Sequence, residues 1–405
     1  MDWTVLSVFL LVYAGMILGG LPGLALDRTG VALLGALALV GLKRLTPADA
    51  WGAVDISTMA LLFGLMVISA QFRLGGFYTR VTRALAATAA PPAVLLALLV
   101  LVTGLLSAVL ANDIVCLAVT PVLVEGCARR GLNPVPFLLG LACAANVGSA
   151  ATLIGNPQNM LIGQVLQLSF VSYLAAAAVP TVIGLGLVWL VVCWRVRGRW
   201  HVHTPIPVVQ APDFSRWQAG KGVAVLMVVM GAFLFTPLPR EVVALGAAAV
   251  LLVSRHMASR SMLALVDWQL LVLFISLFVI NAALATSGWL DHLLASLRSG
   301  GVDITSPGLL FLAAVVLSNL VSNVPAVMML LPTAAGFDGG VILALASTLA
   351  GNLFIVGSIA NIIVVEQAAP LGVSISWRDH AKVGIPVTLT TLAVAALWLL
   401  ARTPS

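Results

Sequence analysis

Apolar runs long enough to cross a bilayer fill most of this chain, and short polar stretches separate them. At roughly 20 apolar residues per crossing, the first part of the chain predicts crossings at 4–20, 29–45, 54–74, 136–167 and 170–194. A polar, basic linker follows at 196–221. Beyond it, crossings are predicted at 222–236, 239–254, 266–287, 340–368 and 383–401.

One further apolar segment, 91–128, is nearly two crossings long and carries Asn112 and Asp113 near its midpoint. A polar turn at that depth fits a hairpin that enters the membrane and returns to the same side. We therefore predict a re-entrant hairpin over 91–128, with Asn112 at its tip.

The second half of the chain repeats the pattern of the first. A shift of 211 residues places Asn112 on Asn323, which predicts a second re-entrant hairpin over 307–335. Each half holds five crossings, an odd number, so the second half must be inverted relative to the first. The predicted fold is an all-α polytopic membrane protein with two inverted-topology repeats, 1–195 and 222–405. The two hairpin tips are expected to face one another across a shared site.

The composition supports a membrane protein. Of the 405 residues, 61% are apolar and only 8% are charged, whereas a soluble protein of this size needs roughly 25% charged residues to cover its surface. The net charge of +6 does not indicate nucleic-acid binding, because no basic stripe with interleaved aromatic residues occurs.

The distribution of basic residues predicts the orientation. When sides alternate along the predicted crossings, 15 of the 20 Lys and Arg residues fall on the side of the linker. Basic loops mark the cytoplasmic side. The linker is therefore predicted to be cytoplasmic, with both termini outside a cytoplasmic membrane.

Polar residues and glycines interrupt two crossings, 136–167 and 340–368, near mid-membrane. Broken helices at that depth are tolerated where they line a protected cavity, and their ends attract small ions and polar solutes. Small and polar residues can also simply join helices, but clusters repeated at equivalent places favour a binding site. The candidate binding residues are Asn112, Asn146, Ser149, Thr152, Asn156, Asn159, Ser322, Asn323, Asn352, Ser358 and Asn361.

Asp113 is the candidate coupling residue. A carboxylate near the bilayer centre is costly, so it indicates a group that binds a proton or pairs with a cation. The structural alternative is an acid that caps the second helix of the hairpin. Val324 occupies the matching place in the second half, so the repeat supplies one acid. Asp55 and Asp267, at equivalent starts of crossings, are interpreted as helix caps.

The chain resembles the ion transporter superfamily, which includes arsenical-resistance permeases, the melanosomal P protein, NhaD-type sodium/proton antiporters and divalent anion/sodium symporters. The residues that carry the resemblance are Asn112-Asp113, Thr120-Pro121, Gly155 to Asn159, Ser322 to Pro325, Asn352, Gly357-Ser358 and Asn361. Together they cover nearly the whole chain and are specific for the superfamily.

The hairpin tips distinguish the branches of that superfamily. The dicarboxylate symporters carry Ser-Asn-Thr at both tips, whereas this chain has Ala111-Asn112-Asp113 and Ser322-Asn323-Val324. These tips resemble the arsenical permease and P-protein branch, which implies proton-coupled exchange. Arsenite pumps usually show Ala-Asp-Thr-Ala-Ser in the first broken crossing, and this chain departs from them with Gly148-Ser-Ala-Ala-Thr152.

The predicted function is secondary transport of a small anionic or neutral oxyanion across a lipid bilayer, with proton-coupled efflux of arsenite or antimonite preferred. A Na⁺-coupled di- or tricarboxylate symporter and a Na⁺/H⁺ antiporter are the alternatives, and H⁺ is favoured over Na⁺ as the coupling ion. No nucleotide motif is present, so an ion gradient or a separate cytoplasmic ATPase subunit would supply the energy. We expect no catalytic residues, metal, cofactor or nucleic-acid partner, and the resemblance implies a homodimer.

Overall fold

The computed structural model describes residues 1–21, 23–202, 205–207, 209 and 212–402, and these residues form helices joined by turns and short loops. The helices of the first half are α1 (Trp3–Leu18), α2 (Arg28–Gly41), α3 (Pro47–Gly52), α4 (Ile56–Leu74), α5 (Phe77–Ala87), α6 (Pro92–Val109), α7 (Asn112–Arg129), α8 (Pro134–Ser149), α9 (Pro157–Val165) and α10 (Phe170–Val196).

The helices of the second half follow in the same order. They are α11 (Arg216–Phe235), α12 (Arg240–Leu252), α13 (Ser259–Leu263), α14 (Trp268–Thr286), α15 (Trp289–Ser299), α16 (Pro307–Val321), α17 (Asn323–Leu330), α18 (Gly336–Ala350), α19 (Ile359–Ala368) and α20 (Trp377–Arg402), with 3₁₀ turns η1 (Leu331–Thr333), η2 (Ile355–Gly357) and η3 (Ala369–Leu371). Helices α4 and α14 both have 19 residues, and α5 and α15 both have 11.

Among the described residues, six helices are long and apolar enough to cross a membrane: α4, α6, α10, α11, α14 and α20. The shorter apolar helices are α1, α2, α8, α16, α17, α18 and α19. Four pairs of α-helices follow one another directly in the chain: α6 with α7, α8 with α9, α16 with α17 and α18 with α19. The chain is therefore an all-helical polytopic membrane protein, as the hydropathy pattern predicts.

The two ends of the first hairpin lie close together in space. Helices α6 and α7 meet at Leu110 and Ala111, within the predicted range. The Arg130 side chain, just after α7, donates hydrogen bonds to the carbonyl oxygens of Ala86, Thr88 and Ala90, just before α6. The second hairpin, α16 with α17, turns at Ser322.

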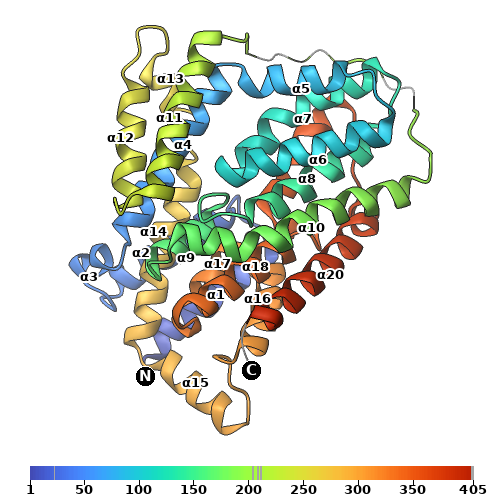
Figure 1. Ribbon diagram of the computed structural model, residues 1–405. Helices are drawn as coiled ribbons and strands as arrows, with labels where there is room; N and C mark the ends of the chain where they lie inside the picture. Colours follow the sequence, from blue (N-terminus) through green and yellow to red (C-terminus); the bar gives the residue numbers. More distant parts are fainter. Residues whose placement is uncertain (22, 203–204, 208, 210–211, 403–405) are drawn as a thin grey trace.

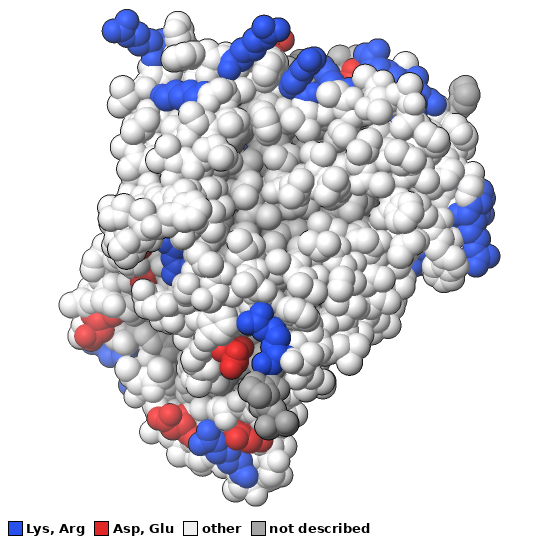
Figure 2. All heavy atoms as spheres, in the orientation of Figure 1, with Lys and Arg blue, Asp and Glu red and all other residues white. Residues whose placement is uncertain are grey.

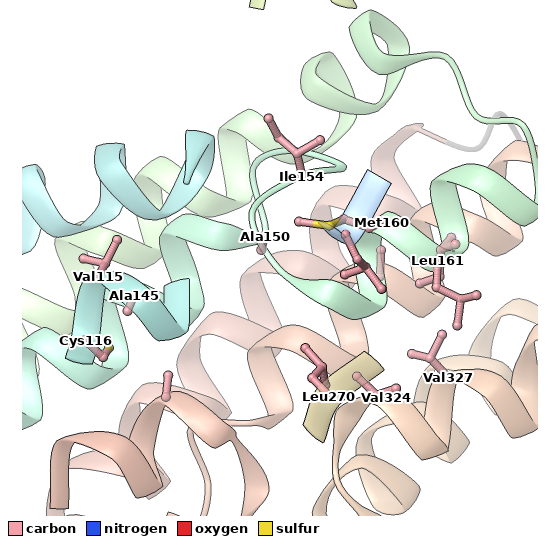
Figure 3. Close-up of a cluster of buried hydrophobic side chains, with 14 of the residues drawn as sticks. Val115, Cys116, Ala145, Ala150, Ile154, Met160, Leu161, Leu270, Val324 and Val327 are labelled. Carbon is pink, nitrogen blue, oxygen red and sulfur yellow. The ribbon is translucent and has the colours of Figure 1, made fainter. Parts of the chain in front are cut away.

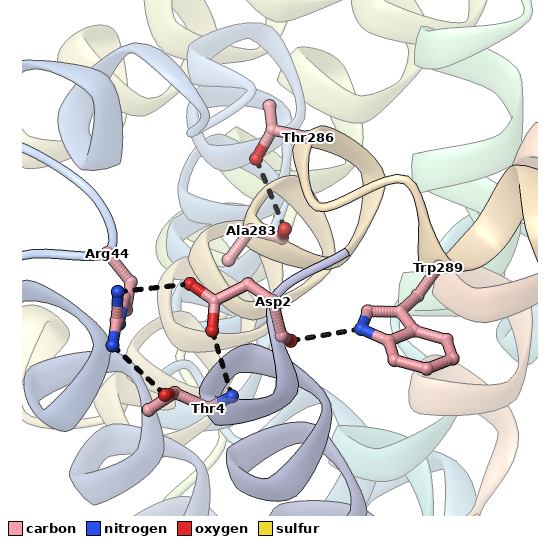
Figure 4. A network of polar contacts seen from close by, with 6 residues as sticks. All are labelled: Asp2, Thr4, Arg44, Ala283, Thr286 and Trp289. Carbon is pink, nitrogen blue, oxygen red and sulfur yellow. Dashed lines mark hydrogen bonds and ion pairs between the residues drawn. The ribbon is translucent and has the colours of Figure 1, made fainter.

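Besides the short helices α3 and α13, two longer helices, α5 and α15, lie in segments that hydropathy leaves as connections, so that expectation is wrong at these places. Each has only 11 residues and mixes apolar with charged positions, which a search for long apolar runs passes over. In Figure 4 the Trp289 Nε1 at the start of α15 donates to the backbone oxygen of Asp2, while Arg44 contacts the Asp2 carboxylate at 3.3 Å. This network fixes α15 beside the N-terminus.

The linker is shorter than predicted. The Ser215 side chain caps α11 by accepting from the Gln218 N–H, so the last six residues of the predicted range 196–221 are helical. Residues 203–204, 208 and 210–211 of that range lie outside the described residues.

Helices from the two halves pack against each other instead of forming separate units. Helix α4 packs on α12, α2 on α14, and α10 on α20, and in Figure 1 α4, α11 and α12 stand side by side at the upper left. A Cβ atom on Gly64 of α4 would lie 2.7 Å from the Ala244 backbone of α12. Glycine therefore permits this close approach.

Candidate functional site

The two hairpin tips and the two interrupted crossings meet at one small cavity of about 20 Å³. Its lining residues are Asn112, Asp113, Pro157, Gln158, Ser322, Asn323, Val324, Ser358 and Ile359. That volume accommodates about one water molecule. The tips thus lie together, which is the central geometric expectation from the sequence.

Four helices begin at this cavity. Helix α7 starts at Asn112, α9 at Pro157, α17 at Asn323 and α19 at Ile359, and the first residues of all four are in the lining. Helix N-termini carry unpaired N–H groups and partial positive charge. Since no Lys or Arg is among the lining residues, these helix ends and the amide groups form the electropositive part of the site.

Asn146 lies behind the cavity and joins its two halves. Its Oδ1 accepts from Asn112 Nδ2 at 3.2 Å and from Ser358 Oγ at 2.8 Å, and its Nδ2 donates to Asn352 at 2.9 Å and Asn361 at 3.1 Å. All four partners come from the other breaks or tips. A single buried amide therefore sets the distance between the first tip and the second broken crossing.

A second polar cluster holds the first broken crossing in shape. The Asn156 side chain caps α9 by accepting from the Asn159 N–H at 2.9 Å and donates to Ser149 Oγ at 2.9 Å. The Asn159 amide donates to Tyr173 Oη and to the Thr152 carbonyl, each at 3.1 Å. These bonds satisfy backbone groups that the break removes from helical pairing.

Asn323 ties the second tip to both broken crossings. Oriented with its nitrogen toward the carbonyl oxygens of Ser347 and Gly357, it donates to each at 3.1 Å, and its oxygen accepts from Gln158 at 3.3 Å. A Cβ on Gly351 would lie 2.9 Å from this amide. A side chain at position 351 would therefore press on the Asn323 amide.

The second broken crossing is held by Asn361, Asn352 and His380. The Asn361 amide donates to the carbonyl of Gly351 at 2.8 Å, and the His380 ring nitrogen lies 3.0 Å from the Asn352 carbonyl. Asn352 Nδ2 and Asn112 Oδ1 are buried without a partner among the described residues. Of these two residues only Asn112 lines the cavity, so its Oδ1 is the atom that is placed to accept from a solute.

Asp113 lies between two cavities. It lines the polar cavity and also a second cavity of about 30 Å³, which is mostly apolar and includes Asp267. Among the described residues its carboxyl has no hydrogen bond or ion pair, and α7 has no side-chain cap, so the capping alternative is not what the geometry shows. Apolar side chains from three helices line the same two cavities as Asp113: Val324 lines the first, and Met160 and Leu270 line the second. All three belong to the apolar cluster of Figure 3.

The structure separates the predicted residues into two groups. Asn112, Ser322, Asn323 and Ser358 line the cavity with Asp113. The others are buried in the hydrogen-bonded shell that positions them: Asn146, Ser149, Thr152, Asn156, Asn159, Asn352 and Asn361.

Sequence reasoning missed several members of the site. Gln158 lies inside the quoted Gly155 to Asn159 motif and lines the cavity. Thr348 accepts from Asn156 and Gln158, although it precedes its break inside an apolar run. Asp267 caps α14 by accepting from the Leu270 N–H at 2.9 Å, as expected, but it also borders the cavity of Asp113.

The second tip has a strained backbone. Ser322 adopts φ 77° and ψ 162°, a region open essentially only to glycine. The turn is therefore held by its surroundings and does not follow from the preference of its own residue. The first tip is fixed differently, because the Asn112 N–H donates to the Gly155 carbonyl at 3.2 Å.

Comparisons with known proteins agree with this architecture. The chain is 30% identical over 404 residues to an uncharacterized transporter of Mycobacterium tuberculosis, covering 93% of this chain and 94% of that protein. It is 27% identical over 448 residues to the silicon efflux transporter LSI3 of Oryza sativa subsp. japonica, covering 92% of each. A putative transporter arsB of Dictyostelium discoideum is 27% identical over 164 residues, which are 40% of this chain and 29% of that protein.

The crystal structure of the YdaH transporter of Alcanivorax borkumensis has the same fold, with a TM-score of 0.60 over 98% of this chain and 96% of that chain at 15% identity. The sequence pattern of the citrate transporter family (CitMHS) matches residues 8–341. These matches confirm the superfamily that the tip and break motifs predict. The chain belongs to the citrate transporter (CitMHS) family, within the ion transporter superfamily of membrane transporters.

Proposed function

We propose that this protein is a secondary active transporter that exports a small oxyacid, neutral or anionic, in exchange for protons, with arsenite and antimonite as the first substrates to test. The observation that carries the proposal is the cavity at which four helix N-termini, several amides and one carboxyl converge without a Lys or Arg. Such a site offers many weak donors and acceptors and no fixed positive side chain.

The polar groups match a small hydroxylated solute. Asn112 has an unpaired Oδ1 that can accept from an O–H group. Gln158 and the hydroxyls of Ser322 and Ser358 also line the cavity, so both the oxygens and the O–H groups of an oxyacid find partners. The names of two relatives, a silicon efflux transporter and a putative transporter arsB, support solutes of this class.

Asp113 supplies the coupling in this proposal. A charged carboxyl buried beside apolar side chains is unfavourable unless a proton or cation neutralises it. A substrate and a proton would therefore occupy adjacent parts of the same site in alternation. Energy comes from the proton gradient, without an ATPase subunit.

A Na⁺-coupled di- or tricarboxylate symporter is the second candidate, and the description of the family as citrate transporters favours it. A carboxylate substrate would find four helix N-termini but would need bound Na⁺ to offset Asp113. A third candidate is a Na⁺/H⁺ antiporter. The presence of two carboxyl groups, Asp113 and Asp267, in the lining of one cavity favours it.

The surface charge supports the orientation proposed from the sequence. In Figure 2, Lys and Arg gather along the upper and right edges of the view, whereas acidic and basic residues mix at the lower left. Both termini lie at the lower end in Figure 1, and α10 ends on the right. We place the basic side in the cytoplasm and both termini outside a cytoplasmic membrane. The homodimer implied by the resemblance stays a prediction.

Transport by purified protein in liposomes tests the proposal. Vesicles with an imposed pH or Na⁺ gradient are assayed with arsenite, antimonite, silicic acid, citrate and succinate. We expect flux of an oxyacid that responds to the pH gradient in vesicles that contain this chain alone. Na⁺-driven citrate or succinate flux would establish the second candidate, and Na⁺/H⁺ exchange without a solute the third.

A further inference from the structure

A basic cavity of about 920 Å³ lies away from the candidate transport site, between the start of α8, the end of α10, the segment that follows it and the start of α20. Its lining includes Arg195, Arg197, Arg199, His201 and Lys382, with Asp379 as the acidic member. At the right of Figure 2, Lys and Arg residues cover this part of the surface.

The three arginines of the cavity have no acidic partner among the described residues. Lys382 is paired with Asp379 at 3.7 Å, whereas the guanidinium groups of Arg195 and Arg197 lie 5.1 and 5.6 Å from the Trp194 ring centroid. Like charges held around one cavity repel each other. A bound anion would remove that repulsion.

The segment that presents these arginines is held in place by its backbone. The Asn133 N–H donates to the Trp200 carbonyl at 2.7 Å and the Val202 N–H to the Gly131 carbonyl at 3.1 Å. The Trp200 ring packs on Phe137, with centroids 5.7 Å apart. In this extended stretch alternate side chains point the same way, so Arg199 and His201 both reach the cavity while Trp200 faces α8.

The cavity opens beside a surface that suits lipid chains. On α10, Leu190 and Trp194 are 53% and 54% exposed, next to the arginines that follow them. Tryptophan and arginine are typical of the membrane interface, and basic cavities between membrane helices bind phospholipid headgroups. We propose that this cavity binds the phosphate of an anionic phospholipid, with Arg197 and Arg199 as its main donors.

Native mass spectrometry of the detergent-purified full chain, titrated with phosphatidylglycerol, tests the proposal. The variant pair Arg197→Ala/Arg199→Ala is compared with Arg255→Ala/Arg260→Ala, which removes two exposed arginines outside the cavity. We expect the first pair to weaken binding of the tightest lipid at least about tenfold, because charge-assisted bonds to phosphate are lost, and the second to leave it within about twofold. Phosphatidylcholine should bind no more tightly to the parent chain than to either variant.

Equal weakening in both pairs would overturn the proposal, because it would show only a general attraction between surface charge and lipid. Displacement of phosphatidylglycerol by an equal concentration of inorganic phosphate would also overturn it in favour of a soluble anion. If the double variant does not fold, Arg199→Gln alone must weaken binding, with Arg255→Gln as its control.

Discussion

Asp113 differs from the other charged residues of the chain in its surroundings. It borders two cavities, its carboxyl has no bonding partner among the described residues, and Val324 lies nearby in the corresponding second tip. Elsewhere, acids such as Glu125 are paired with arginines. An unpaired acid in a membrane-spanning segment is a candidate functional group by default, and this is the basis of the coupling role proposed for Asp113.

Replacing this acid by its neutral amide tests its role. We expect Asp113→Asn to reduce flux driven by a pH gradient to the level of protein-free liposomes, because the side chain no longer takes up a proton. Thermal unfolding of the purified protein should stay within about 2 °C, since no bond is lost. The control is Asp55→Asn, a cap of α4 away from the cavity. Full gradient-driven flux in Asp113→Asn would exclude the proposed role.

The strained tip gives a prediction with a definite sign. Ser322 has positive φ, and no hydrogen bond of its hydroxyl occurs among the described residues. Relief of roughly 1–3 kcal/mol of strain exceeds the entropy cost of glycine, about 0.5–1 kcal/mol. Ser322→Gly should therefore raise the unfolding temperature in a thermal-shift assay. Ser318→Gly, inside α16, should lower it, and a decrease in both variants would contradict the strain.

At the scale of elements, the broken crossings are positioned by close contacts between helices as well as by polar bonds. A Cβ on Gly148 of α8 would lie 2.4 Å from the Gly104 backbone of α6, and one on Gly155 would lie 2.3 Å from the Ser149 carbonyl. Backbone atoms cannot move aside as a flexible side chain can. Helix α6 of the first hairpin and helix α8 of the first broken crossing are therefore packed in direct backbone contact at Gly104 and Gly148.

Gly148→Ala should separate α6 from α8. We expect a loss of stability of about 2–3 kcal/mol, as in other overpacked cores, measured by chemical or thermal unfolding in detergent. The matched control is Gly231→Ala on α11, where a Cβ meets nothing within 4 Å and alanine favours the helix by up to about 1 kcal/mol. An unchanged unfolding temperature in Gly148→Ala would argue against this close contact between α6 and α8.

At the scale of the whole molecule, the two amphipathic helices mark opposite ends. Helix α15 is fastened to the N-terminus, and α5 precedes the first hairpin on the side that carries most of the basic residues. Their accessibility therefore reports the orientation of the chain.

Single cysteines on these two helices test that orientation. In a background with Cys116, Cys127, Cys143 and Cys193 replaced by alanine, Ser296→Cys on α15 should react with a membrane-impermeant maleimide on intact cells. Ala87→Cys on α5 should react only after permeabilisation. The reverse pattern would place the basic side outside and contradict the charge rule.

Much of the fold follows from local sequence. The long apolar runs fix the membrane class, and Asn112 and Asn323 locate both hairpins because a polar turn inside an apolar double run has few other solutions. Helices α5 and α15 could not be found in this way, since 11 mixed residues carry too little hydropathy. Ser215 shortened the linker through a capping bond that composition does not reveal.

In the candidate site, too, some features follow from the sequence and others only from the tertiary structure. Sequence alone determined where the two crossings break, because Gly, Pro and Asn cluster there, whereas a single proline such as Pro121 is accommodated inside α7. Only the tertiary structure decided that Asn146 is a buried connector instead of a lining residue, and that Asp267 shares a cavity with Asp113. The contact of Asn146 with Asn352, and the cavity shared by Asp113 and Asp267, join residues more than 150 positions apart. Packing between the two halves of the chain sets them, and a local sequence pattern carries no information on that packing.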